Sequence, residues 1–323
     1  MASTAATAVR PKRSLWQRLA NGDEVAHLVT LIFAASVFLV TVLLMAELWR
    51  NSHLSQAKFG WKFLIGTNWD PVAEDFGALP YIYGTILTSV LALLISVPLG
   101  LGAAIFLAEL APAKLANACT FLVELLAAVP SVIYGLLAIF TLVPLLRHYI
   151  EPFLKSTLGF LPFFKGPSLG IGYLAAGLIL AVMTFPYIIA ISRESLLEVP
   201  RDQREAALAL GATRWESTSQ VVVPYARLGI IGSVFLALAR ALGETMAVTM
   251  VIGNSASIHA SWFAPGYTIA AVIANEFTEA TGNVQLSSLV ELGIVLFLIT
   301  IIMNAAARLL VLATSRRGTA HAA

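Results

Sequence analysis

The sequence is short of charged residues and contains a single cysteine, Cys119. Charged residues make up 12% of its 323 residues, whereas hydrophobic residues make up 59% and the mean hydropathy is +0.85. A soluble domain of this length needs a larger share of charge on its surface, so the composition excludes that class and predicts an integral membrane protein with several spans. One cysteine also excludes a disulfide within the chain and a cysteine-based metal site.

Two further kinds of site are missing from the sequence. No G-x-x-x-x-G-K-[ST] motif occurs, so the chain has no phosphate-cradling loop with which to bind ATP itself. The five histidines are scattered without the spacing of metal ligands. We therefore expect no catalytic residue, no metal and no cofactor in this chain, and no nucleic-acid partner.

Long apolar runs recur along the chain, and each has about the 20 residues that an α-helix needs to cross a bilayer. We predict an all-α integral membrane fold with six transmembrane helices, near residues 27–49, 85–108, 118–146, 169–191, 228–252 and 287–312. Pro130 predicts a break within the third helix, and residues 147–168 are predicted to form an external loop. Between the fifth and sixth helices, the apolar segment YTIAAVIANEF predicts a short helix at the membrane interface.

Lysine and arginine are divided unevenly between the two sides that six spans define. Thirteen of them fall on the side of the termini and of the loop 192–227, six fall on the other side, and Arg240 lies within a span. By the positive-inside rule, the termini and this loop are predicted to be cytoplasmic. The expected organisation is a disordered tail over residues 1–24, a transmembrane domain over residues 25–312 and a C-terminal tail over residues 313–323.

The loop between the fourth and fifth spans has a distinct helical pattern. Residues 201–210, RDQREAALAL, are good helix formers, and Gly211 is able to adopt the left-handed backbone that closes a helix. Thr213 and Glu216 have the T-x-x-E spacing of a capping box, which predicts the start of a second helix. Pro224 is predicted to end that helix.

The same loop resembles the EAA loop of bacterial ABC import permeases. The resemblance rests on Glu205, Ala206, Ala207, Gly211, Val221, Val223 and Pro224, with valine at two positions where the family more often has Ile and Leu. It implies a pair of short coupling helices seated in a groove of a cytosolic ATPase. The coupling residues that it implies are Glu205, Ala206, Ala207, Gly211, Thr213, Arg214 and Trp215. The alternative is an ordinary helical hairpin at the protein surface.

One pair of opposite charges is predicted inside the membrane. Arg240 lies near the middle of the fifth span, where a charge costs about 2.5 to 3.5 kcal/mol, and Glu244 follows four residues later on the same helical face. A guanidinium group matches a tetrahedral oxyanion through two hydrogen bonds. We hypothesise that Arg240 is a transient anion contact, that Glu244 pairs with it and tunes it, and that Thr245 and Thr249 line the path. The alternative is a buried ion pair that fixes helix packing.

Four blocks of sequence resemble the PstC-type permease subunits of bacterial phosphate ABC importers. They are WDPVAEDFGALPYIYGTILTS (69–89), ELLAAVPSVIYG (124–135), VPRDQREAALALGATRW (199–215) and ARALGETMAVTMVIGN (239–254). The resemblance implies the type I ABC importer fold, with this subunit forming half of a phosphate path through the bacterial inner membrane.

The resemblance also implies a set of partners. They are a PstA-like permease subunit, two copies of a PstB-like ATPase that binds ATP and Mg²⁺, a periplasmic PstS-like phosphate-binding protein, inorganic phosphate and membrane lipid. Two alternatives stay open. One is a permease for another oxyanion, such as molybdate or sulfate. The other is an ion-coupled secondary transporter, which would need an internal repeat that we do not find.

Overall fold

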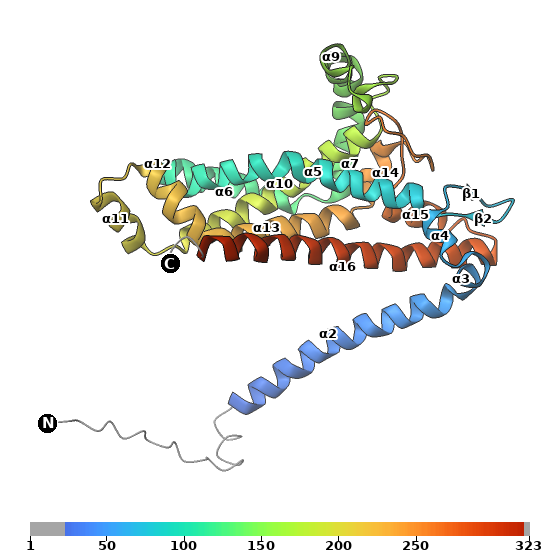
Figure 1. The fold of residues 1–323 in the computed structure, drawn as a ribbon, viewed down its shortest axis with the longest axis horizontal. Helices are drawn as coiled ribbons and strands as arrows, with labels where there is room; N and C mark the ends of the chain where they lie inside the picture. The colour runs from blue at the N-terminus through green and yellow to red at the C-terminus, as the bar shows by residue number, and fades with distance from the viewer. Residues whose placement is uncertain (1–22, 320–323) are drawn as a thin grey trace. The chain divides into compact units, whose positions relative to one another are not determined.

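The computed structural model describes residues 23–319, with side chains over residues 25–309 (Figure 1). Nearly all of the predicted N-terminal tail, residues 1–22, lies outside the described residues. The chain divides into two compact units, residues 1–50 and residues 51–323. Six helices of the described part are long and apolar enough to cross a membrane, which confirms the predicted number of spans.

The first unit contains a long apolar helix, α2 (Asp23–Asn51). Its membrane-length stretch, Val25–Asn51, includes the whole of the predicted first span. Apolar side chains surround this helix instead of forming a single stripe, as is typical of a helix immersed in lipid.

The second unit is built around α10 (Tyr173–Leu197), whose apolar stretch is the most buried of the six candidate spans. Three long helices complete this bundle, namely α5 (Leu79–Ile105), α13 (Val223–Gly243) and α16 (Asn283–Thr319) (Figure 1). α5 and α13 both pack on α10, and α16 packs on α13. The predicted second, fourth and sixth spans are therefore confirmed, with shifted ends.

Glycines let α5 and α10 approach each other closely. A Cβ atom added at Gly177 of α10 would lie 2.7 Å from the Cβ atom of Leu91 in α5. One added at Gly100 of α5 would lie 2.8 Å from the Cγ2 atom of Ile188 in α10. Because helices in lipid are held together by close packing and not by the exclusion of water, these glycines stabilise the pair.

One end of the bundle is covered by short elements. They are α3 (His53–Phe59), α4 (Lys62–Ile65), the antiparallel strands β1 (Trp69–Asp70) and β2 (Asp75–Phe76), and α15 (Ile269–Glu276). Trp69 pairs with Phe76 in the hairpin. The helix α15 confirms the prediction of a short helix between the fifth and sixth spans. An apolar cluster that includes Phe63, Phe76 and Ile269 joins these elements.

The third span differs from the prediction. The predicted helix is divided into α6 (Ala113–Ala128) and α7 (Ser131–Leu137), and the membrane-length stretch is Ser131–Leu158. Proline lacks an N–H group and restricts the residue before it, so α6 ends ahead of Pro130. Beyond α7, the chain stays helical through η2 (Ala138–Leu142), α8 (Val143–Leu145), η3 (Leu146–Ile150) and α9 (Glu151–Leu158). The predicted external loop 147–168 is therefore helical in its first half.

The fifth span also differs from the prediction. A continuous helix of 30 residues, Arg214–Gly243, is formed by α12 (Arg214–Ser217), η5 (Thr218–Val222) and α13. Pro224 lies in the first turn of α13 and does not end the helix, because the wider π-helical turn η5 precedes it and accommodates the proline. The helix ends at Gly243, and α14 (Met246–Ile252) is a separate helix.

Candidate functional site

The loop after α10 folds as a helix, a turn and a second helix, as the sequence predicts. α11 (Arg201–Ala209) is followed by Gly211, whose φ of +91° lies in the left-handed region that favours glycine. Thr213 then caps α12, because the Glu216 backbone N–H donates to Thr213 Oγ1 over 3.3 Å. In return, the Thr213 backbone N–H donates to Glu216 Oε2 over 2.7 Å, which completes the capping box.

This loop lies at the end of the bundle opposite to the β hairpin (Figure 1). Several of its large apolar side chains face outward, with Leu210 90% and Trp215 60% exposed. Glu205, Ala206 and Arg214 are also exposed, whereas Ala207 is buried. Exposed apolar groups on an otherwise polar loop mark a surface for another macromolecule.

A hollow lies between the two short helices of this loop. Its volume is about 420 Å³, and its lining residues include Ala206, Ala207, Leu210, Glu216 and Val221. Of the seven residues singled out for coupling, Ala206 and Ala207 line this hollow.

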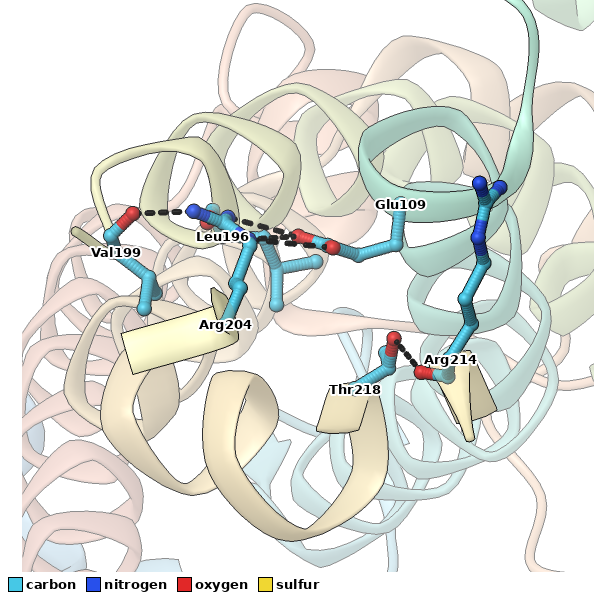
Figure 2. A network of polar contacts seen from close by, with 6 residues as sticks. All are labelled: Glu109, Leu196, Val199, Arg204, Arg214 and Thr218. Atoms are coloured by element: carbon cyan, nitrogen blue, oxygen red, sulfur yellow. Dashed lines mark hydrogen bonds and ion pairs between the residues drawn. The ribbon is translucent and has the colours of Figure 1, made fainter. Parts of the chain in front are cut away.

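A polar network fastens the inner side of α11 to the bundle (Figure 2). Arg204 Nη2 lies 2.8 Å from Glu109 Oε1, at the end of the π-helical turn η1 (Phe106–Leu110) that extends α5. Arg204 Nε donates to both Glu109 oxygens, over 3.2 Å and 3.3 Å. Arg204 Nη2 also donates to the Leu196 carbonyl over 2.7 Å, and Nη1 donates to the Val199 carbonyl.

Sequence reasoning did not identify this network. Neither Glu109 nor Arg204 belongs to a motif that the sequence analysis singles out as a site. The one available signal was a complementary pair of charges, an acid at the end of the second span and a base beside the EAA residues. Their separation of 95 positions carried no indication of contact.

The predicted pairing of Arg240 with Glu244 is wrong. The helix ends at Gly243, and Glu244 has an extended backbone with ψ of 128°, so the two residues do not share one helical face. Over residues 25–309, no ion pair joins them. Glycine is a weak helix former, and the chain breaks at this point in preference to continuing to Ile252.

Arg240 instead lies against an aromatic ring. Its Cζ atom is 4.6 Å from the centroid of Tyr187 in α10, within the range of a cation–π contact. The Tyr187 hydroxyl donates to the Ala127 carbonyl over 3.2 Å, and the Tyr134 hydroxyl donates to the Leu126 carbonyl over 2.7 Å. Both tyrosines thereby satisfy carbonyls at the end of α6. The buried Arg240 Nε has no hydrogen-bond partner.

Of the other three residues proposed for the path, Glu244 and Thr245 lie at the break between α13 and α14, and Thr249 lies within α14. Glu244 Oε1 accepts from the Ala247 backbone N–H over 3.4 Å, and Thr245 Oγ1 donates to the Gly243 carbonyl over 3.4 Å. Thr249 Oγ1 is buried and has no hydrogen-bond partner. The helices on the two sides of the break therefore each carry one buried polar atom without a hydrogen-bond partner, Arg240 Nε in α13 and Thr249 Oγ1 in α14, and such atoms are uncommon in folded proteins.

A second hollow, of about 530 Å³, lies at the hairpin end and is lined by residues that include Trp69, Tyr267 and Glu276. Trp69 Nε1 donates to Glu276 Oε2 over 2.8 Å. Burial raises the pKa of Glu276, and the Trp69 hydrogen bond opposes this change. This end of the molecule thus holds a partly buried carboxylate beside the hollow.

Comparisons with known proteins give consistent results. A family model described as "Binding-protein-dependent transport system inner membrane component" matches residues 96–317. The "Phosphate transport system permease protein PstC" of Mesorhizobium japonicum is 46% identical over 318 residues, which cover 96% of each chain. The protein of the same name from Haemophilus influenzae is 46% identical over 87% of this chain and 90% of that protein.

One solved structure supports the fold. The structure titled "Crystal structure of a bacterial ABC transporter involved in the import of the acidic polysaccharide alginate" has a TM-score of 0.58 and 14% identity. The match covers 91% of this chain and 98% of the alginate transporter chain. At this level of identity, the likeness shows a shared arrangement of helices.

Proposed function

The chain belongs to the family of binding-protein-dependent transport system inner membrane components, and we propose that it is the PstC-type permease subunit of an ATP-driven phosphate importer. The observation that carries this proposal is 46% identity to a PstC protein over 96% of both chains. The chain is a multi-pass membrane protein and a transport subunit, not an enzyme. It forms half of the path for inorganic phosphate.

In this proposal the ATPase binds at the end that carries α11 and α12. Supporting it are the exposed Leu210 and Trp215 and the hollow between the two helices, which suit a protein partner. The residues Glu205, Ala206, Ala207, Gly211, Thr213, Arg214 and Trp215 form this docking surface. ATP and Mg²⁺ bind to two copies of a PstB-like ATPase, and both termini of this chain face the cytoplasm.

The remaining partners follow from the same assignment. A PstA-like subunit completes the path in the bacterial inner membrane, and a PstS-like protein delivers phosphate to the hairpin end. Within the path, Arg240 contacts the anion transiently. Its unpartnered Nε and its position on the Tyr187 ring support this role, because a donor that no protein group satisfies is available to a ligand. Glu244, Thr245 and Thr249 border the same stretch.

Reconstitution tests the proposal. Proteoliposomes with this chain, a PstA-like subunit and a PstB-like ATPase should take up radiolabelled phosphate when ATP and a PstS-like protein are supplied. Unlabelled phosphate should compete, whereas excess molybdate or sulfate should not. Uptake of molybdate or sulfate in place of phosphate would assign the path to that oxyanion. If no ATPase copurifies with the chain, the importer assignment is wrong.

A further inference from the structure

The helix α11 has few apolar attachments to the transmembrane bundle. Ala207 is its one buried side chain. The apolar cluster beneath it contains residues of α5, α10, η5 and α13, among them Ala104, Leu196 and Val222, but none from α11. Packing alone therefore does not tie α11 to the helices that it faces.

Arg204 supplies the missing attachment. Over residues 25–309, every side-chain hydrogen bond that leaves α11 is made by Arg204, to Glu109 of η1, to Leu196 of α10 and to Val199 just beyond α10 (Figure 2). Both carbonyls lie at the C-terminal end of α10, where a helix has fewer backbone donors for its last carbonyls. The Leu196 carbonyl also accepts from the Val199 backbone N–H over 3.4 Å. One guanidinium group thus closes the end of α10 and holds the carboxylate at the end of η1.

The two charged side chains are shielded from solvent, which makes the contact durable. Their exposed fractions are 20% for Arg204 and 12% for Glu109. Two other ion pairs, Arg50–Glu47 and Lys58–Glu74, have side chains that are each 41% or more exposed. Shielding and bidentate geometry distinguish a strong charge pair from a surface pair that contributes little.

The placement of this contact gives it a mechanical consequence. The helix α12 runs directly into α13, so a displacement of the loop reaches α13 through the backbone. α5 has no such connection, because Glu109 is 95 positions away from Arg204 in the sequence. Arg204 and Glu109 also line a separate hollow, likewise of about 420 Å³, together with Glu205 of the coupling motif. Arg204 is therefore adjacent to the motif on which the ATPase would act.

We propose, building on the function proposed above, that the Arg204–Glu109 pair transmits the movement of α11 to α5 and α10. Arg204 and Glu109 are positioning residues, since neither contacts the substrate. When the ATPase displaces α11, the guanidinium fork carries η1 and the end of α10 with it, while α12 carries α13. Loss of the pair uncouples the two halves of the bundle. ATP is then hydrolysed without a matching transport of phosphate.

The test is a double-mutant cycle in the reconstituted complex with Arg204→Lys, Glu109→Gln and the two changes together. Lys114→Gln is the matched control, because Lys114 is an exposed base in the helix after η1 with no described partner. The readouts are the ATPase that copurifies, the rate of ATP hydrolysis and the phosphate transported per ATP. A role confined to holding the structure together would not change the last ratio.

Both single variants should retain the ATPase and hydrolyse ATP, while phosphate transported per ATP falls by about tenfold, within the range of coupling between sites. The double variant should be no worse than the more impaired single variant, and Lys114→Gln should match the wild type. A wild-type ratio in both single variants would overturn the proposal. The proposal would also be overturned if the losses in phosphate transported per ATP multiplied in the double variant. Loss of ATPase binding in Glu109→Gln would overturn it too, because this variant leaves the carbonyl contacts of Arg204 in place.

The outcomes separate this proposal from the proposed function. If the wild-type complex transports no phosphate, the function assigned to the chain fails. If the wild type transports phosphate and the variants keep its ratio, the coupling role of Arg204 and Glu109 alone fails.

Discussion

Two arginines in different regions of the molecule use the same chemical group in opposite ways. In the loop region, all three nitrogens of Arg204 donate hydrogen bonds, to a carboxylate and to two carbonyls. At the break in the fifth span, Arg240 lies on the Tyr187 ring, and its buried Nε has no partner. A guanidinium group whose donors all have protein partners holds helices together, whereas one with an unpaired donor can still donate to an anion.

The largest expected effect is on stability, where replacing Arg204 should cost more than replacing Arg240. Arg204→Met removes one partner of a shielded ion pair and leaves Glu109 and the Val199 carbonyl without the hydrogen bonds that Arg204 donates, at a cost of about 3 kcal/mol. Arg240→Met loses a cation–π contact, at a cost of about 1 kcal/mol. Thermal unfolding of the purified complex in detergent should therefore show a clearly larger decrease in Tm for Arg204→Met. Equal decreases would mean that both arginines are structural.

For phosphate uptake, we expect the change at Arg240 to have a larger effect than the change at Arg204. Arg240→Gln removes the charge proposed to meet the anion, and phosphate uptake should fall by about 100-fold, as loss of roughly 3 kcal/mol of charged hydrogen bonding implies. ATPase binding should be unchanged. The matched control is Arg227→Gln, because Arg227 is an exposed base on the same helix. Normal uptake by an assembled Arg240→Gln complex would make Arg240 a packing residue.

A substitution at Gly211 tests the turn between α11 and α12 separately from the Arg204 contact that attaches α11 to the bundle. Gly211→Val places a branched side chain at φ of +91°, where backbone strain is expected to cost about 2 kcal/mol. A Cβ atom added at Gly211 would have no atom within 4 Å, so the strain is not accompanied by a Cβ clash. Less ATPase should copurify with this variant, whereas Arg204→Lys should retain it. Gly232→Ala, at an equally open helical position, is the control. Full ATPase recovery with Gly211→Val would remove this turn from the docking surface.

The smallest expected effect is at Tyr187. Tyr187→Phe keeps the ring under Arg240 but removes the hydroxyl that donates to Ala127, whereas Tyr187→Leu removes both. The cation–π contact contributes about 1 kcal/mol, so uptake should change severalfold more in the leucine variant than in the phenylalanine variant. Identical uptake kinetics in the two variants would show that the ring does not position Arg240.

The local parts of both regions could be predicted from the sequence. Gly211 and the capping box of Thr213 and Glu216 depend on residues within one turn of each other, and both were predicted correctly. The six spans follow from apolar length, and the match to the PstC proteins supports the resemblance read from four blocks. Pro130 was identified correctly as a break, although the span that follows it extends farther than predicted.

The remaining features depend on contacts between distant residues or on competing local effects. Glu109 and Arg204 meet because α5 and α10 pack side by side, which no local pattern encodes. Spacing favoured a pair between Arg240 and Glu244, but the helix ends at Gly243 and the arginine lies on Tyr187 of another helix. Pro224 was read as a stop, yet the π-helical turn before it lets the helix continue.

That uninterrupted helix makes the fifth span a lever. Its 30 residues, from Arg214 to Gly243, extend over about 45 Å at 1.5 Å per residue. One end of this helix lies three residues beyond Arg240, and the other end is α12, where we propose that the ATPase binds. Tilting such a rod by about 5° moves its far tip by roughly 4 Å, a distance similar to the separation of Arg240 from the Tyr187 ring. A small displacement at the α12 end is therefore large enough to separate the guanidinium group from the Tyr187 ring.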